Sequence, residues 1–223
     1  MQTGGVFRDR TDAGHLLAEK VASRLAHPLA PQGVEGGLVL GLPRGGVPVA
    51  ALVADAMGVP LDVLVVRKIG VPWQPELAMG AVGEHGAVVL NDDVVSASGV
   101  GPEELDALIR KASQQVEDVV AQLRPSTGPL DVKGRMAIVV DDGVATGATA
   151  RAAASVLRRS GSGPIILAVP VAALSTVETL GSCFDEVICV MTPWRFGSVG
   201  QHYQQFEQVS ISHVRRLLGR SPT

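Results

Sequence analysis

Short apolar runs alternate with helical patterns along most of the chain. The runs cover residues 38–40, 63–66, 87–90, 137–140 and 165–169, and several are separated by stretches with helical periodicity. Apolar strands that alternate with helices are typical of a parallel sheet with helices on both faces. The pattern therefore predicts an α/β fold with a central, mostly parallel sheet, and the length of 223 residues suits a single domain over 1–223.

Two helices can be predicted from their own apolar periodicity. Apolar residues recur at a four-residue step across 17–25, after the capping candidates Thr11 and Asp12, so this helix should end near 27–28. The second helix fills an insertion over 101–124. Because amphipathic helices usually face their own core, a packing helix of an inserted lobe is favoured over a dimerisation helix. Its apolar stripe consists of Leu105, Ile109, Ala112, Val116, Val119 and Leu123.

Composition and charge argue against several classes of partner. The net charge is −3 and the isoelectric point is near 5.9, so no positive field draws nucleic acid and any anion site must be built locally. No run of about 18 apolar residues occurs, and no signal peptide is recognisable, so no membrane span is predicted. Cys183 and Cys189 lack the spacing of a metal knuckle and are too few for a disulfide framework. We therefore expect a cytoplasmic protein with a small-molecule ligand.

The strand at 137–140 runs into a turn whose residue types suit a sugar phosphate. Asp141 and Asp142 come first, and the turn continues through Gly147 to Thr149 before an alanine-rich helix begins. Unpaired amides at a helix start attract an anion, glycines let the backbone close around it, and threonine hydroxyls add donors. Two carboxylates would repel a bare phosphate, so they are better matched to sugar hydroxyls or to Mg²⁺. The turn is neither a Walker loop nor a dinucleotide fingerprint.

A second turn repeats this arrangement after the strand at 38–40. Residues 41–46 place Arg44 between a strand end and two glycines, and a helix follows. A guanidinium offers a fork of donors to a diphosphate, while the glycines let backbone amides approach it. A turn with an ordinary surface arginine is the alternative, because paired glycines are common in turns.

The stretch 139–149 closely resembles the signature of type I phosphoribosyltransferases, a hydrophobic strand, two acidic residues and then Thr-Gly-x-Thr. Those enzymes bind phosphoribosyl diphosphate (PRPP). The resemblance implies that Asp141 and Asp142 hold the ribose hydroxyls and also Mg²⁺, directly or through PRPP and water. It also implies that the rest of the turn binds PRPP, with 145–149 around the 5'-phosphate. These residues are Gly143, Val144, Ala145, Thr146, Gly147, Ala148 and Thr149.

The turn around Arg44 is similar to the pyrophosphate loop of the same family. Relatives often hold a cis peptide just before the basic residue, and in this chain that bond would be Pro43–Arg44. Pro43, Gly45 and Gly46 are therefore expected at PRPP beside Arg44.

Arg67 and Lys68 follow the second apolar run, and residues 73–86 are rich in glycine and proline. This composition predicts a flexible loop. In relatives a loop at this position closes over the diphosphate and carries basic residues, so both are candidate ligands, and Lys68 is the preferred catalytic residue. The ionisable residues of the loop are expected to be solvated rather than to act as acids or bases; they are Glu76, Glu84 and His85.

The chain departs from purine-salvage relatives on the acceptor side. Ala145 stands where they often carry an aspartate near the base nitrogen, so hypoxanthine or guanine specificity is not expected. Acceptor recognition in the family usually falls to a small hood built from the chain ends, which would be 1–10 and 192–210. Trp194 and Phe196 would stack on a flat acceptor or pack the hood's own core. The pattern of this tail resembles a little-characterised bacterial branch of the family.

The resemblance implies a magnesium-dependent transferase that moves the phosphoribosyl group of PRPP to a nitrogen of a nucleobase or similar heterocycle, with release of pyrophosphate. Arg44, Lys68 and Mg²⁺ would take the charge on the leaving diphosphate, while Asp141 and Asp142 fix the ribose. A PRPP-sensing regulatory protein with the same fold is the alternative, and phosphorolysis or hydrolysis of a ribose phosphate is a third. A closing loop and an arginine favour the transferase. A homodimer is compatible with the sequence.

Overall fold

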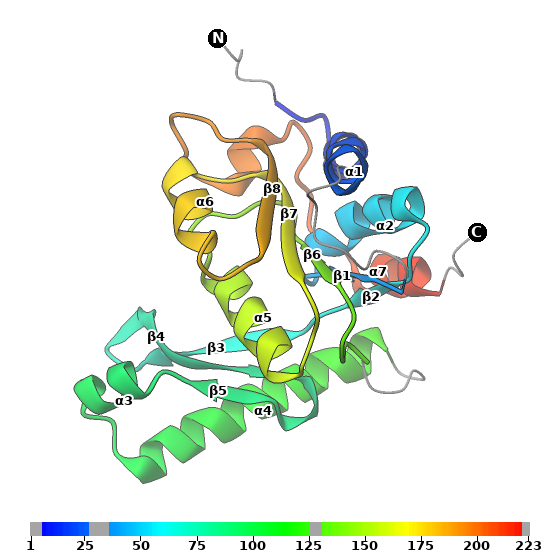
Figure 1. Ribbon diagram of the computed structural model, residues 1–223. Coiled ribbons are helices and arrows are strands. Elements are labelled where there is room, and N and C mark those ends of the chain that lie inside the picture. The colour runs from blue at the N-terminus through cyan, green and yellow to red at the C-terminus, as the bar shows by residue number, and fades with distance from the viewer. Residues whose placement is uncertain (1–5, 27–35, 125–130, 220–223) are drawn as a thin grey trace.

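The computed structural model describes residues 6–26, 36–124 and 131–219. Figure 1 shows a central sheet with helices on both faces and a smaller lobe, residues 66–123, beside it. The central strands are β1 (Leu38–Gly41), β2 (Leu61–Val63), β6 (Ala137–Val140), β7 (Ile165–Val171) and β8 (Glu186–Met191). They lie in the order β2-β1-β6-β7-β8, and every pairing is parallel. The predicted α/β fold with a parallel sheet is confirmed.

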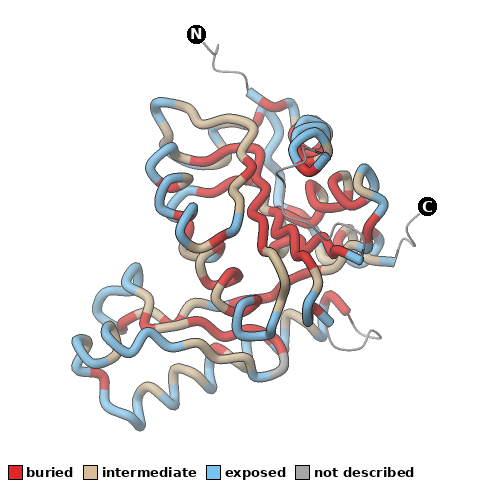
Figure 2. The backbone as a smooth tube through the Cα atoms, viewed as in Figure 1, coloured by how far each residue is buried: buried red, intermediate tan, exposed pale blue. Residues whose placement is uncertain are grey.

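Helices bury both faces of this sheet. α1 (Arg10–Leu25) and α2 (Gly46–Met57) cover one face, while α5 (Ala148–Arg159) and α6 (Leu174–Leu180) cover the other. Successive residues of β6 therefore enter different cores, with Ile138 packing toward α1 and α2 and Val139 toward α5. Figure 2 shows the buried residues concentrated along these strands. Burial on both faces explains why the parallel strands appear in the sequence as continuous apolar runs.

The first helix begins earlier than its predicted caps. Asp9 is the N-cap, and its side chain accepts a hydrogen bond from the amide of Asp12 at 2.8 Å. Thr11 and Asp12 lie inside the helix, because Asp9 already has the extended backbone and side-chain oxygen that a cap needs. The helix ends at Leu25, and the predicted end near 27–28 lies outside the described residues.

The chain leaves the parallel sheet after β2. The run predicted as one strand over 63–66 is split, because β2 ends at Val63 and β3 (Val66–Val71) belongs to a second sheet. In that sheet β3, β4 (Gln74–Gly83) and β5 (Val88–Leu90) pair antiparallel. The run at 87–90 is a strand, but its place in the parallel sheet was predicted wrongly, since an apolar run does not reveal its pairing partner.

Residues 73–86 do not form the predicted flexible loop. Most of them form β4, and Glu84–Gly86 form a short 3₁₀ helix, η1. Two of the glycines that suggested a loop lie where space is short, because a Cβ at Gly80 would clash with β5 and a Cβ at Gly83 would clash with α5. The outer half of β4, residues 74–77, is exposed, which explains why it lacks a buried apolar pattern.

The predicted long helix is α4 (Pro102–Leu123), which follows the short helix α3 (Asp92–Ser98). Ala112, Val116 and Leu123 of its apolar stripe are buried in a cluster with residues of β3 and β4. The preferred interpretation as a packing helix is confirmed, because the stripe faces the core of its own lobe.

The N-terminal segment pairs with the tail that follows β8. Phe7 forms a parallel bridge with Tyr203, and the amide of Gln204 donates to the carbonyl of Phe7 at 2.8 Å. The tail contains η2 (Val199–His202) and ends in α7 (Ile211–Leu218). Residues 1–5 of the predicted hood lie outside the described part of the chain. In the part that is described, no helix combines the length and the hydropathy needed to cross a membrane.

Candidate functional site

Two turns meet at the carboxyl edge of the central sheet. β1 and β6 are adjacent and in parallel register, with Gly41 opposite Val140, so the turns that follow them emerge side by side. The amide of Leu42 in the first turn donates to the carbonyl of Val140 at 2.8 Å. The carboxyl edge of a parallel sheet is where ligands bind in open α/β folds. The fold thus brings together the two segments that the sequence singled out.

Glycines allow this close approach. A Cβ at Gly46 would lie 2.5 Å from the carbonyl oxygen of Val140 and 2.8 Å from Cα of Asp141, and a Cβ at Gly45 would overlap the carboxylate of Asp142. The peptide bond Pro43–Arg44 is cis, as predicted. Gly45 and Gly46 are therefore required by packing between the two turns, independently of any ligand.

The second turn ends in the N-terminus of α5. Gly147 has φ +74 and begins the helix without a side-chain cap. Among the described residues, the amides of Ala145, Thr146 and Gly147 have no hydrogen-bond partner. Val144 differs, because its amide donates to the carbonyl of Val171 at 2.8 Å. The arrangement leaves a set of donors and a positive helix end for an anion, which suits a phosphate.

Asp141 is half-buried at the start of the same turn. Its Oδ1 accepts a hydrogen bond from the amide of Asp142 at 2.9 Å. Burial raises the pKa of the Asp141 carboxyl well above its ordinary value, and the charge of the neighbouring Asp142 raises it further. A carboxyl group in this state gains from a ligand that brings hydrogen-bond donors or positive charge.

Asp142 is held by the chain ends. Arg10 Nε and Nη2 both lie 2.8 Å from Asp142 Oδ2, and the Tyr203 hydroxyl donates to the backbone carbonyl of Asp142 at 2.5 Å. Arg10 also donates to the carbonyl of Glu207 at 2.7 Å, and its guanidinium lies 4.0 Å from the centre of the Phe206 ring. Sequence reasoning missed Arg10 as a partner of the acidic pair, although it assigned residues 1–10 to a hood.

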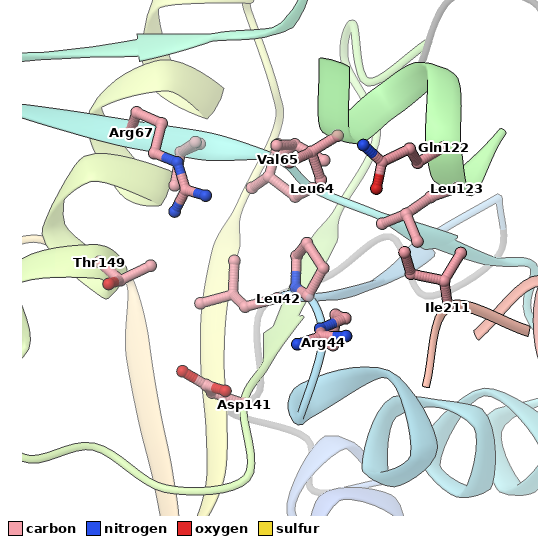
Figure 3. A pocket seen from close by; sticks show the side chains of 13 residues that line it. Leu42, Arg44, Leu64, Val65, Arg67, Gln122, Leu123, Asp141, Thr149 and Ile211 are labelled. Carbon is pink, nitrogen blue, oxygen red and sulfur yellow. The ribbon is translucent and has the colours of Figure 1, made fainter. Parts of the chain in front are cut away.

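A cavity of about 470 Å³ opens beside Asp141. Figure 3 shows Arg67 reaching into it from β3, with Thr149 on one side, and with Asp141 and Arg44 below. Within the described part of the chain, neither Arg44 nor Arg67 forms an ion pair or side-chain hydrogen bond. The volume is in the range of small-molecule sites. The cavity is lined by Leu42, Pro43, Arg44, Leu64, Val65, Val66, Arg67, Val119, Gln122, Leu123, Asp141, Thr149 and Ile211.

Lys68 lies in a different cavity from Arg44 and Arg67. Its Nζ pairs with Glu76 at 3.2 Å, in a cavity on the other side of β3 that also contains Arg151. Successive side chains of a strand point to opposite faces, so Arg67 and Lys68 cannot both enter the site from β3. The cavity beside Asp141 is therefore lined by Arg67, whereas Lys68, which the sequence favoured, lines the other cavity.

The ionisable residues of 73–86 have different environments. Glu76 is exposed, as expected, but Glu84 is only 7% exposed and pairs with the buried Arg124. The prediction of a solvated Glu84 was therefore wrong, since the segment is folded into the lobe. The side chain of His85 lies outside the described part of the structure.

The aromatic residues proposed for the acceptor lie away from Asp141 and Asp142. Trp194 is 84% exposed, with the guanidinium of Arg195 at 4.2 Å from its ring centre, and Phe196 stacks on His202 with ring centres 5.3 Å apart. Neither residue lines the cavity at Asp141 or a second cavity of about 420 Å³ at Asp142. That second cavity is lined by Arg10, Arg44, Gly45, Asp142, Phe206, Glu207, Gln208 and Val209.

Comparison with known sequences identifies the family. The family model of the phosphoribosyl transferase domain matches residues 15–205. Two Mycobacterium tuberculosis proteins, named provisionally as phosphoribosyl transferases, are 46% identical over 216 residues, which is 97% of this chain and 47% of theirs. The chain spans about half the length of these curated relatives.

Solved structures are similar over most of the chain. TT1426 from Thermus thermophilus matches with a TM-score of 0.81 and 39% identity, covering 96% of this chain and 97% of its own. The AQ2163 protein from Aquifex aeolicus matches with a TM-score of 0.51 and 10% identity, covering 86% of this chain and 78% of its own, which indicates a shared fold alone. With the family model matched over most of its length and its two characteristic turns side by side, the chain belongs to the phosphoribosyl transferase family.

Proposed function

We propose that this protein binds PRPP at the cavity beside Asp141 and transfers its phosphoribosyl group to a nitrogen of a small acceptor, a nucleobase or similar heterocycle. One observation carries the proposal: Arg44, Arg67, Asp141 and Thr149 line a single cavity at the N-terminus of α5. These groups provide donors for phosphates and an acceptor for sugar hydroxyls in one place. We also propose that the protein is located in the cytoplasm, which is supported by its two free cysteines, Cys183 and Cys189.

In this proposal the two turns divide the ligand between them. The amides of 145–147 and the helix end bind the 5'-phosphate, and Asp141 accepts from the ribose hydroxyls. Arg44 and Arg67 bind the diphosphate as guanidinium forks. When the acceptor nitrogen displaces pyrophosphate at C1, negative charge develops on the departing diphosphate, and these arginines stabilise it. No covalent intermediate with the protein is required.

Mg²⁺ fits the donor set, because hard carboxylate oxygens are its preferred ligands. Asp141 and Asp142 would hold it, and among the described residues they are not joined by a third ionisable ligand, so the diphosphate and water would complete its coordination. Bound there, the ion would neutralise charge on the diphosphate.

Ala145 favours a second candidate function. In this candidate the protein is a sensor that binds PRPP without transferring its phosphoribosyl group. Ala145 supports it, because the turn has no carboxylate at this position to contact the nitrogen of an acceptor. The lobe gives this candidate further support, since β4 is a paired strand rather than a free closing loop.

The test is pyrophosphate release from PRPP and Mg²⁺ against a panel of purines, pyrimidines and other nitrogen heterocycles. Asp141→Asn with Asp142→Asn should abolish release, while Asp55→Asn with Asp106→Asn, which removes two exposed carboxylates, serves as the matched control. Acceptor-dependent release lost only in the first double variant supports the transferase. Saturable PRPP binding without release supports the sensor, and no PRPP binding overturns both.

A further inference from the structure

The chain crosses from the central sheet into the lobe at Leu64–Val65, on the wall of the cavity beside Asp141. The amide of Leu64 donates to the carbonyl of Gly41 at 3.1 Å, which fixes the first residue of the crossing to β1. The amide of Val65 donates to Glu84 Oε1 at 3.1 Å. Arg67 follows two residues later and lines the same cavity. The direction of Arg67 therefore depends on how this crossing is held.

Glu84 connects the crossing to a buried ion-pair network. Its second carboxylate oxygen pairs with Arg124, and Arg124 Nε lies 3.2 Å from Asp62 Oδ1 on β2. The side chains of Arg124 and Glu84 are 3% and 5% exposed. Buried charges are tolerated only when they are paired, so the three side chains must keep their geometry. Arg124 thus ties the strand before the crossing to the carboxylate that holds the crossing itself.

The two residues just before Arg124 in the chain line the cavity. Arg124 follows the last residue of α4, and Gln122 and Leu123 just before it line the cavity opposite Asp141. Burial also raises the pKa of Asp62, while the Arg124 guanidinium acts against that rise. The network therefore lies in a region of low polarity, where charges interact more strongly than in water.

We propose that Arg124 and Glu84 are positioning residues that hold the Leu64–Val65 crossing and thereby direct Arg67 at the diphosphate of the ligand. This inference rests on the proposed function in treating the cavity as a diphosphate site. It goes beyond that function because it assigns a role in ligand binding to two buried residues that do not touch the ligand. If the network only stabilised the lobe, replacing it would not change the contribution of Arg67 to ligand binding.

A double-mutant cycle with inorganic pyrophosphate and Mg²⁺, followed by calorimetry, tests this inference. Arg67→Ala should weaken binding about tenfold. Replacing both deeply buried charges together, Glu84→Leu with Arg124→Met, leaves only Asp62 without its partner, and the Asp62 side chain is 23% exposed. The variant should therefore fold, yet it should weaken binding about three- to tenfold. In the Arg67→Ala background the same pair of changes should have no further effect, since Arg67 is the group through which they act.

Two controls separate positioning from stability. Val116→Ala makes a cavity in α4 without touching the network, and it should lower the melting temperature while leaving pyrophosphate affinity unchanged. The single variant Arg124→Lys keeps the charge, so it should lose less pyrophosphate affinity than the Glu84→Leu, Arg124→Met variant. Amide hydrogen exchange at Val65 gives a measurement without ligand, and it should become faster in the Glu84→Leu, Arg124→Met variant.

Equal loss of affinity in both backgrounds, loss in Val116→Ala as large as in the network variant, or no pyrophosphate binding by the wild type would each overturn the inference. PRPP itself is titrated in parallel. Coupled pyrophosphate binding without PRPP binding would overturn the proposed function and support the positioning role. PRPP binding with uncoupled, additive losses would support the proposed function and overturn the positioning role.

Discussion

Arg10 and Asp142, separated by 132 positions in the sequence, form an ion pair beside the candidate phosphoribosyl site, in which Arg10 Nε and Nη2 both lie 2.8 Å from Asp142 Oδ2. Their side chains are 13% and 14% exposed. Because Arg10 also binds the carbonyl of Glu207 and stacks on Phe206, it joins the N-terminal helix, the signature turn and the tail. One carboxylate oxygen of Asp142 is thereby occupied, while the carboxylate of Asp141 lines the cavity.

We predict that Arg10→Met destabilises the protein by about 2 kcal/mol, because it leaves a partly buried carboxylate without its partner. Urea unfolding of variant and wild type measures the difference. Arg8→Met is the matched control, since Arg8 is 77% exposed in its pair with Asp12, and surface pairs contribute less than about 1 kcal/mol. Equal losses of stability in the two variants would show that the Arg10–Asp142 pair contributes no more than a surface ion pair.

Asp141 should make the stability of the unliganded protein fall as pH rises. Its pKa is raised in the folded state, so the folded protein binds the proton more tightly than the unfolded chain. Between the ordinary and the raised pKa the free energy of unfolding then falls with pH, by at most about 1.4 kcal/mol per pH unit. Asp141→Asn removes this dependence and should be more stable than the wild type at neutral pH, with the difference vanishing in acid.

The measurement is urea unfolding of both proteins from about pH 4 to pH 8, with Asp55→Asn as the exposed control. A stability difference between wild type and Asp141→Asn that stays constant over this range would contradict a raised pKa at Asp141.

Gly46→Ala should disrupt the contact between the two turns. Its Cβ would lie 2.5 Å from one backbone atom and 2.8 Å from another, and backbone atoms cannot move aside as a flexible side chain can. We expect a loss of about 1–3 kcal/mol in thermal unfolding, together with weaker PRPP binding. Gly101→Ala is the control, because a Cβ there meets nothing within 4 Å and φ is −72, so the change should stay within about 0.5 kcal/mol. Similar losses at both positions would argue against close packing of the turns.

Arg67 and Lys68 should differ in their effect on PRPP affinity. Arg67→Ala removes a guanidinium from the cavity with Arg44, and we expect affinity to fall about tenfold or more in calorimetric titration. Lys68→Ala removes an ammonium that pairs with Glu76 in another cavity, so affinity should change less than about twofold. The reverse order would contradict the placement of the diphosphate in the cavity beside Asp141.

Local sequence was sufficient for the parts of the fold that depend on residue type alone. Strands β1, β6 and β7 are buried on both faces, so each appears as an apolar run. The stripe of α4 has helical period, which predicted both the helix and the face that it buries. The two turns were found because donors, glycines and carboxylates follow one another directly in the chain.

The lobe could not be predicted in the same way. β4 is half-exposed and contains glycines that fit against neighbouring segments, so its composition is that of a loop. The edge strand β8 of the central sheet is mostly half-buried, so it has no continuous buried run to mark it. In both cases the neighbouring segment determines the structure, and a single stretch of sequence does not contain that information.

The sequence by itself determined the parallel sheet and the long helix, because short-range patterns of residue types carry both of them. Its resemblance to the phosphoribosyltransferases indicated the family and implied the cis bond before Arg44. The tertiary structure alone decided which of two adjacent basic residues enters the cavity, that Arg10 holds Asp142, and that Glu84 is buried with Arg124. These relationships depend on strand alternation and on contacts between residues far apart in the chain, and they exist only once the segments are packed together.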